Sequence, residues 1–444
     1  MLLEELNTKW APMIEHADLP KIGKKSVRDA VSIMMENTEK ACIQAGTQGQ
    51  YRLLDEAAVP ANFMGASSST QGAGGIDTFD PIMISLVRRA APNLMAFDVA
   101  GVQPMTGPTG LIFAMRSRYS TQTGGETFYN EVNTAFSSVT TGANTFGQKN
   151  VGTVPGVSNN AANGAYNTGT GMSTAQGEAL GSTGNVAFPE MAFSIEKVSV
   201  TAKERALAAG YTMEIAQDLK AIHGLDAETE LSNILATEML AEINRELIRT
   251  ILVTGVAGSQ TGTTTAGFFD LDTDSNGRWS VEKFKGLMFQ LEREANKVAK
   301  DTRRGKGNVL ICSSDVASAL QMTGKLDYTP ALANNLEVDD TGNTFAGILN
   351  GRFKVYIDPY TTGDYMVIGY KGASSFDAGL FYCPYVPLQM VRAVDPVSFQ
   401  PRIGFKTRYG MVANPFAQGL TQGLGALTPD TNLYYRRTIV NNLM

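Results

Sequence analysis

The chain has 444 residues, with 37 Lys and Arg against 43 Asp and Glu, and a net charge of −6. This balance excludes a basic nucleic-acid binder that is held by neutralising phosphates. No stretch reaches about 18 uninterrupted apolar residues, which excludes a membrane-spanning helix, and three cysteines without a CxxC pair fit a reducing compartment better than a disulfide framework.

The first 56 residues differ in charge from the sequence that follows. They contain 16 charged residues, whereas residues 57–194 contain only 12 in 138 positions. Apolar residues recur at helical spacing opposite the charged ones, which predicts an amphipathic helix. These apolar residues are Ile22, Val27, Val31, Met34 and Met35. The segment is either a helical arm that packs on a neighbour or a detachable segment whose role ends after assembly.

Sequence of low charge fills the next region. Residues 57–80 are rich in Ala, Ser, Gly and Gln, a composition typical of a mobile strap. Pro81 predicts a short helix over 81–90, because Pro suits the first helical position, and residues 111–115 predict a strand. Residues 120–190 hold 12 Gly and five charged residues. We expect a long β-excursion here that gains order by lying on another subunit, since a structureless loop of this length is improbable within one domain.

Helical periodicity returns after residue 200. Thr201–His223 is expected to be a helix that stops at Gly224. Asp226 is expected to cap a second helix over 226–252, whose length of about 40 Å suits a spine for the fold. Its apolar residues recur at three- and four-residue steps: Leu231, Ile234, Leu235, Met239, Ile243, Leu247 and Ile251.

The sequence after residue 252 contains both helical and strand periodicities. Helices are expected over 281–300 and 315–322. Strands are expected over 309–313, 353–357, 365–369, 380–392 and 403–409. There is no internal repeat with a period of 20–50 residues. These elements predict a fold of the α+β class.

Residues for catalysis are scarce. The two histidines are His16, in the charged segment, and His223, at a helix C-terminus where the helix dipole favours its cation. The three cysteines, Cys42, Cys312 and Cys383, are expected to be buried thiols. The sequence has no GxSxG, GxxxxGK[ST], GxGxxG or HExxH motif. We therefore expect no enzyme.

One short motif is typical of a calcium site. Asp272, Asp274 and Asn276, followed by Gly277, match the first six positions of an EF-hand loop, but position twelve is Lys283, where such a loop needs a bidentate Glu. A turn closed by glycine that leads into the next helix explains the same residues without a metal. The alternative is a weak Ca²⁺ site at Asp272, Asp274 and Asn276, and no other cofactor is expected.

Longer stretches carry a family resemblance. Residues 101–116, 200–250, 277–284 and 434–444 are similar, in this order, to the major capsid protein of T-even-type contractile-tailed phages, and the similarity extends from about residue 80 onward. The stretches include Tyr211-Thr212-Met213-Glu214, Ile222-His223-Gly224-Leu225-Asp226 and Glu242-Ile243-Asn244-Arg245-Glu246.

The resemblance implies a Hong Kong 97-type capsid fold, an α+β architecture with an N-arm, an extended β-loop, a peripheral domain with a long spine helix, and an axial domain. On this sequence it implies a charged N-terminal propeptide arm at 1–56, the N-arm and start of the body at 57–110, the extended loop with a Gly/Ser/Thr-rich insertion at 111–200, the spine helices of the peripheral domain at 201–254, the axial domain at 255–390, and the return strands at 391–444.

The family also implies a propeptide that a prohead protease removes by cutting after Glu in Leu/Ile-x-Glu. Residues 54–56, Leu-Asp-Glu, fit this pattern at the break in charge and are followed by Ala57. The pattern also matches at Glu4 and at Glu242, the latter within a predicted helix. Cleavage is therefore expected between Glu56 and Ala57, and the alternative is that the segment stays attached.

The implied role is a structural major capsid protein of the virion, which forms hexamers that tile an icosahedral or elongated head around DNA. Expected partners are further copies, the minor vertex protein and, during assembly, a scaffold core and the prohead protease. Packaged DNA is expected to touch the inner surface only non-specifically. A run of basic residues closes the helix expected over 281–300: Lys297, Lys300, Arg303, Arg304 and Lys306. Three interpretations stay open for this run, namely a solvated helix end, a contact between subunits, or a patch on the inner surface near the DNA.

Two other roles remain open at the level of sequence. The related minor vertex protein forms pentamers, and the number of copies per virion distinguishes it from the hexameric protein. A secreted, Ca²⁺-binding β-rich binding protein is an alternative from another class. It requires a signal peptide, and the acidic start Met1–Glu5 does not resemble one.

Overall fold

The structure is a computed structural model. It describes residues 3–15, 22–47, 94–127, 132, 136–138, 171–183, 187–275, 277, 279–323, 326–328, 345–395, 400–419 and 423–443. The chain divides into two compact units. Met1–Ile112 and Val198–Met444 form the first, called the body, and Phe113–Lys197 form the second, called the ribbon. The expected strap at 57–80 and the expected helix at 81–90 lie outside the described residues.

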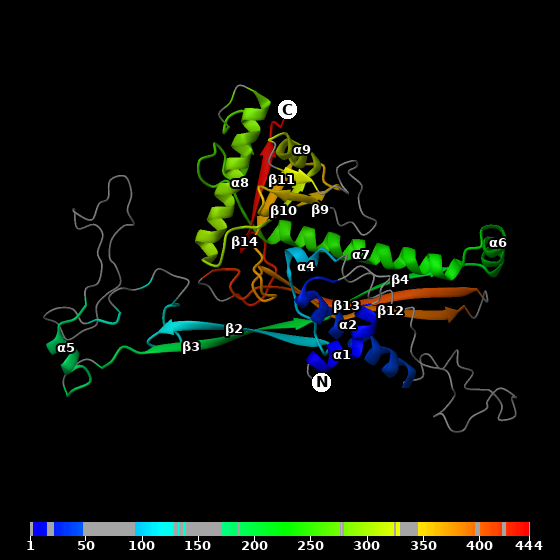
Figure 1. Cartoon of the computed structure of the whole chain (residues 1–444), viewed down its shortest axis with the longest axis horizontal. Helices are drawn as coiled ribbons and strands as arrows, with labels where there is room; N and C mark the ends of the chain where they lie inside the picture. The colour runs from blue at the N-terminus through cyan, green and yellow to red at the C-terminus, as the bar shows by residue number, and fades with distance from the viewer. Residues whose placement is uncertain are drawn as a thin grey trace. The chain divides into compact units, whose positions relative to one another are not determined.

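Helices and strands alternate in the body, which confirms the α+β class (Figure 1). The described helices of the body are α1 (Leu3–Ile14), α2 (Lys25–Thr47), α4 (Ala96–Val99), α6 (Met213–His223), α7 (Ala227–Thr254), α8 (Ser280–Thr302) and α9 (Ser314–Met322). The helices expected over 226–252, 281–300 and 315–322 are thus confirmed. Among the described residues, no helix combines the length and apolar character that crossing a bilayer requires.

Two sheets organise the body. The first has the order β1-β12-β13-β4, from β1 (Gly101–Val102), β12 (Leu380–Val394), β13 (Pro401–Ala413) and β4 (Lys203–Gly210). The second has the order β5-β14-β11-β7-β10-β9-β8, with β6 also on β14; its strands are β5 (Gly255–Ala257), β6 (Phe268–Asp270), β7 (Val309–Ser313), β8 (Leu326–Tyr328), β9 (Phe345–Leu349), β10 (Phe353–Asp358), β11 (Tyr365–Gly369) and β14 (Asn432–Asn441). Every strand expected after residue 300 is present.

Helix α7 lies along the body and supplies one wall of its core. Its buried apolar residues follow the predicted stripe at Leu235, Met239, Ile243, Leu247 and Ile251. Ile234 was also expected in that stripe, but its side chain is 61% exposed. Successive side chains of an α-helix point in different directions, so Ile234 can be exposed although the adjacent Leu235 is buried.

The helix expected over Thr201–His223 is wrong in its first half. Lys203–Gly210 forms β4, which pairs antiparallel with β13, and only Met213–His223 is helical. Lys, Glu, Arg, Ala and Leu all favour a helix, but pairing with β13 supplies a partner for each strand hydrogen bond and overrides that weak preference. Helix α6 does stop at Gly224, whose φ of 68° is the left-handed conformation that glycine adopts without strain.

The ribbon is built on two strands that pair with each other, β2 (Thr109–Tyr119) and β3 (Met191–Thr201). β2 contains the strand expected at 111–115. Among the described residues between them is one short helix, α5 (Thr174–Ala179), capped by Ser173 in a capping box with Gln176. Most of the expected β-excursion over 120–190 lies outside the described residues.

Candidate functional site

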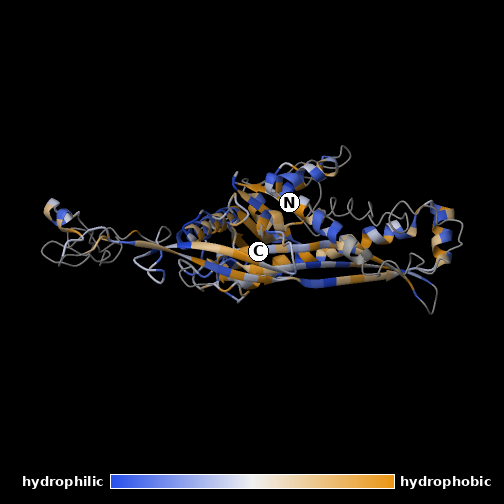
Figure 2. Cartoon of the chain, turned by 90° about the horizontal axis from the view of Figure 1, so that it is seen from below, coloured by the Kyte–Doolittle hydropathy of each residue, from blue (hydrophilic) through white to orange (hydrophobic). Residues whose placement is uncertain are grey.

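One face of the ribbon strands exposes apolar side chains. Because side chains alternate across a strand, every second residue of β2 and β3 lies on this face, and Figure 2 shows hydrophobic and hydrophilic positions along the extended strands. Within the ribbon these residues are Phe113 and Met115 on β2 and Met191, Phe193 and Ile195 on β3, each at least 56% exposed. We call this set the ribbon stripe. Exposed apolar rows of this kind are typical of interaction surfaces.

The opposite face of the ribbon buries charged groups. Arg116 is 2% exposed, and its guanidinium lies 2.9 Å from Glu196 and 3.0 Å from Glu126. Arg118 pairs with Glu196 at 3.0 Å and donates to the Ser194 hydroxyl at 2.8 Å. Each of these pairs joins β2 to β3 or to the turn that follows β2. The pairs therefore fix the register that brings the apolar residues onto one face.

The calcium-like loop is held by its own hydrogen bonds. The Asp274 carboxylate accepts from the Thr264 backbone N–H and hydroxyl, both at 2.7 Å, and from the Asp270 N–H at 3.1 Å. The Asp272 carboxylate is paired with the Lys283 ammonium. Asn276 lies outside the described residues. The cation at position twelve stands where a calcium loop has its bidentate carboxylate, so the described geometry favours the turn.

The histidines and cysteines do not form a reactive site in the described chain. His223 lies in the last turn of α6, as expected, while His16 and the Cys42 side chain lie outside what the structure describes. Burial raises the pKa of both the Cys312 and the Cys383 thiols to about 12. A buried thiol with a raised pKa is a poor nucleophile. The expected cleavage residues, Glu56 and Ala57, also lie outside the described residues.

The basic run is partly neutralised within the body. Lys297 pairs with Asp301 at 3.0 Å, Arg304 pairs with Asp377 at 3.4 Å, and Lys306 pairs with Glu292. Carboxylates of the same chain thus engage three of its five cations. These pairs favour a helix end tied to its own body over a bare cationic patch.

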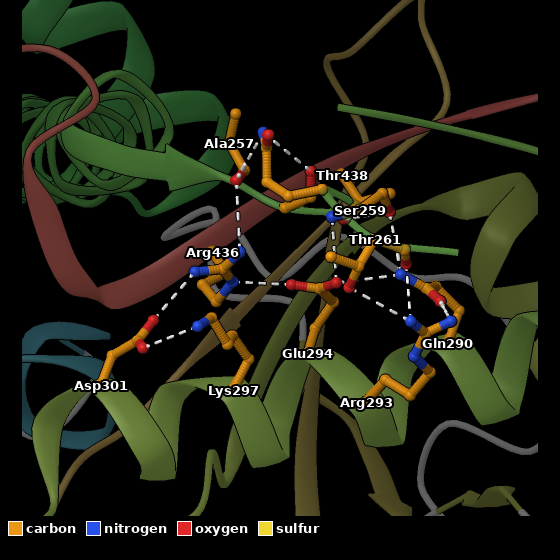
Figure 3. Close-up of polar contacts among 12 residues, drawn as sticks. Ala257, Ser259, Thr261, Gln290, Arg293, Glu294, Lys297, Asp301, Arg436 and Thr438 are labelled. Atoms are coloured by element: carbon orange, nitrogen blue, oxygen red, sulfur yellow. Dashed lines mark hydrogen bonds and ion pairs between the residues drawn. The ribbon is translucent and has the colours of Figure 1, made fainter. Parts of the chain in front are cut away.

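A buried polar network joins α8 to the C-terminal strand β14 (Figure 3). Glu294 accepts from Arg436 Nε at 2.7 Å and from Ser259 N and Gln290 Nε2, each at 2.9 Å. Arg436 also pairs with Asp301 at 3.2 Å. Glu294 and Arg436 are each about 5% exposed or less. With both partners satisfied, the network fixes β14 against α8 and offers no free group for chemistry.

A cavity of about 710 Å³ lies along the outer side of α7. Its walls carry opposite charges that neutralise one another: Arg205 pairs with Glu242 at 3.0 Å and with Glu246 at 2.5 Å, and Arg245 pairs with Asp358. Tyr360 packs against the Arg245 guanidinium at 5.0 Å from the ring centroid. The described ion pairs hold these side chains against one another.

The sequence patterns considered above predict neither the ribbon stripe nor the network around Glu294. The period-two pattern of β3, from Met191 to Thr201, is a strand signal that was available. Arg436 and Glu294 are 142 positions apart in sequence, so no local sequence pattern predicts their pairing.

Comparisons with known proteins agree with one another. Residues 76–440 match the family described as "Major capsid protein Gp23". The chain is 39% identical to the major capsid protein of Serratia phage KSP90, over all of this chain and 99% of that one. It is 35% identical to the major capsid protein of Enterobacteria phage T4, over 99% of each chain. The capsid vertex protein of phage T4 is 30% identical over 50% of this chain and 53% of its own length.

The comparison with solved structures found the capsid of Myoviridae phage XM1, which is 7% identical over 78% of this chain and 92% of that chain with a TM-score of 0.37. Another is Mycobacterium phage Bobi, which is 9% identical over 86% and 96% with a TM-score of 0.39.

Proposed function

Because the chain belongs to the Gp23 family of phage major capsid proteins, we propose that it assembles as hexamers that tile the head shell. It is a structural protein of the capsid and its location is the virion. The same membership supports the Hong Kong 97-type capsid fold expected from the resemblance. A secreted Ca²⁺-dependent binder is not the role of such a protein.

The ribbon stripe carries the proposal of lapped subunits. A two-stranded ribbon is marginal in water on its own, and this one leaves its apolar face open while burying ion pairs on the other. A neighbouring copy that covers Phe113, Met115 and Phe193 removes that apolar surface from water. The subunit role proposed for residues 111–200 is therefore an extended loop that overlaps the next subunit.

The other regions receive matching roles. Residues 57–110 are the N-arm and start of the body, 201–254 hold the spine, 255–390 the axial domain, and 391–444 the return strands. The pairing of β14 (Asn432–Asn441) with β11 supports extending the axial domain to include this last strand. The role is architectural and not catalytic.

Negative-stain microscopy of the concentrated protein tests the assembly. Hexameric tiles or shells are expected, and a persistent monomer overturns the proposal. Phe193→Ser is expected to abolish or strongly weaken tile formation. Its matched control is Glu190→Ser, an exposed position just before the same strand that alternation places away from the stripe face. Equal assembly of both variants contradicts the role of the ribbon stripe.

Maturation is the second part of the proposal. A prohead protease cuts between Glu56 and Ala57, and a scaffold core occupies the shell interior during assembly. The intact mass of the protein taken from virions tests the cut: a mass matching residues 57–444 is expected, and a mass matching all 444 residues overturns it. Packaged DNA then touches the inner wall without sequence preference, since the −6 charge and the paired basic run provide no strong phosphate site.

The capsid vertex protein is the second candidate, favoured by the 30% identity over half the chain. Full-length matches to relatives named major capsid protein, at 35–39% identity, favour the major protein. The copy number per virion decides between the two roles.

A further inference from the structure

The N-terminal helices are packed into the main core of the body. Helix α1 (Leu3–Ile14) contributes Trp10 and Ile14, and α2 (Lys25–Thr47) contributes Val31 and Met35, all of them at most 4% exposed. They belong to the same hydrophobic cluster as the body residues Leu94, Met95, Ala96, Phe97, Val99, Ala100 and Val102. The described helices of the charged segment, α1 and α2, are thus an integral part of this core.

The two helices also hold each other together. Asn7 Nδ2 donates to Asp29 at 2.8 Å, and Lys9 on α1 pairs with Glu36 on α2 at 2.9 Å. The Trp10 indole N–H donates to the same Glu36 carboxylate at 3.4 Å. The helices therefore present one preformed surface to the body, which we call the helical pair, residues 3–47.

Polar contacts fix where the helical pair lies on the body. Asn37 Nδ2 donates to the Met105 carbonyl at 2.7 Å and to the Tyr385 carbonyl at 3.0 Å, and the side chain is buried. The β12–β13 register shifts between Pro384 and Val386, which leaves Tyr385 outside the regular ladder. Asn37 thus supplies a donor for a partly buried carbonyl at a β-bulge, where the register shift interrupts the strand pairing.

An ion pair lies at the other end of the same surface. Lys24, just before α2, pairs with Asp98 at 2.5 Å, and Lys354 pairs with the same carboxylate at 2.8 Å. We call the body surface formed by residues 94–102, Met105 and Tyr385 the seat. It contains an apolar floor, two carbonyl acceptors and one carboxylate.

The position of the expected cut matters for this seat. Thr47 and Leu94 are separated by residues 48–93, and Glu56 is one of them. Every contact described above is made by residues on one side or the other of that interval. Cutting the chain at Glu56 therefore breaks none of them.

We propose that the seat is a binding site for the helical pair as a separate peptide, so that cleavage at Glu56 leaves residues 3–47 bound. Clearing the seat then requires a second event that unfolds or cuts the helical pair itself. An emptied seat exposes its apolar floor and leaves the Met105 and Tyr385 carbonyls without their donor, which keeps the peptide bound. This inference rests on the proposed maturation for its biological timing, but the docking can be tested without the phage protease.

The test uses the full chain with a recognition sequence for a site-specific protease in place of residues 53–59. After complete cleavage, size-exclusion chromatography and native mass spectrometry at micromolar concentration are expected to show the N-terminal fragment bound to the body. Elution of the fragment as a free peptide directly after the cut overturns the proposal. The uncut variant must elute as the wild-type protein does.

Two substitutions in the cleavable chain make the test specific. Asn37→Ala removes both donors to the seat and is expected to raise the dissociation rate of the fragment about tenfold to a hundredfold. Lys24→Ala is expected to raise it by a few-fold, since the pair is partly exposed. The matched control is Lys25→Ala, an exposed neighbour, which is expected to change nothing. A release rate that is the same for Asn37→Ala and Lys25→Ala contradicts the seat.

If the inserted sequence prevents folding, hydrogen exchange of the unaltered chain gives the answer. Residues 27–38 and 94–105 are expected to exchange together, because the helical pair and the seat share one core. Exchange of 27–38 that is a hundredfold faster than that of 94–105 overturns the proposal. The virion mass decides separately whether the cut occurs, so failure of the docking and failure of the maturation are distinguishable.

Discussion

The body and the ribbon use charge and apolar surface in opposite ways. In the body, apolar side chains from α7, α8 and both sheets are buried and most charges are outside, with the pair of Arg436 and Glu294 as a fully satisfied exception. In the ribbon, Arg116 and Glu196 are buried while Phe113 and Phe193 are exposed. The body therefore buries its apolar surface within the chain, whereas the ribbon leaves it exposed, which is the arrangement expected of the proposed overlap with another subunit.

This comparison locates folding and assembly in different parts of one chain. A substitution in the body is expected to change the free energy of unfolding, because the core and its network are complete within the monomer. A substitution on the ribbon stripe is expected to change association at nearly constant monomer stability, since exposed positions contribute within about 0.5 kcal/mol. The tests that follow examine that separation, beginning with the largest effect.

Breaking the buried network of the body is expected to have the largest effect. Arg436→Ala leaves the buried Glu294 without its cation, whereas Asp301 keeps Lys297, and is expected to lower the free energy of unfolding by about 3–5 kcal/mol. Denaturant unfolding measures this change. The control is Arg402→Ala, whose pair with Asp395 is exposed and is expected to contribute less than about 1 kcal/mol. Losses of equal size would show that the body does not depend on its buried charges.

A buried lysine predicts a specific pH dependence of the body. Burial lowers the pKa of Lys371 to about 8, although Asp98 raises it and Lys24 and Lys354 lower it further. Between about pH 8 and 10.5 the unfolded chain binds more protons at this residue than the folded chain, so its contribution to stability rises with pH.

The measurement compares wild type with Lys371→Met. From pH 8 to 9.5 the difference in unfolding free energy is expected to move in favour of wild type by at most about 2 kcal/mol. The buried thiols of Cys312 and Cys383 act in the opposite direction over this range, because burial raises their pKa. They are present in both proteins and cancel in the difference. A pH-independent difference contradicts the prediction.

The ribbon is expected to respond locally. Glu196→Gln removes the charge that holds Arg116 and Arg118, and is expected to destabilise the ribbon by about 1–3 kcal/mol while the unfolding of the body stays unchanged. Hydrogen exchange of residues 113–119 and 191–197 reports the effect. Glu190→Gln, at an exposed position before β3, is the control. A matching loss in the body would mean that the two units unfold together.

Calcium is expected to have the smallest effect. With Lys283 paired to Asp272 and Asp274 occupied by three hydrogen bonds, 1 mM Ca²⁺ is expected to shift the Tm of the wild type by less than about 1 °C. Lys283→Glu supplies the missing carboxylate and is the sensitised variant. A clear shift in the wild type supports the weak site at Asp272, Asp274 and Asn276.

Local patterns predicted the body well where one periodicity dominated. The stripe of α7 from Leu235 to Ile251, the strands after residue 300 and the stop at Gly224 all follow from spacing or from a single glycine. The failure at Lys203–Gly210 has a physical cause: its residues favour a helix individually, and only the distant β13 makes a strand.

The assembly features depend on pairings across long stretches of sequence. Alternation of Arg116 and Arg118 was visible, but their partner Glu196 is about 80 positions away and could not be assigned. The apolar face of α2 was predicted from Val27, Val31, Met34 and Met35, and it is buried. That it packs on the body of its own chain followed only from the structure.

The position of β14 in the second sheet has a consequence for synthesis. Asn432–Asn441 lies between β5 and β6 on one side and β11 on the other. All three of these strands leave the ribosome before β14 does, so the sheet cannot close until residue 441 has been translated. Until then β5, β6 and β11 lack the strand that joins them in this sheet.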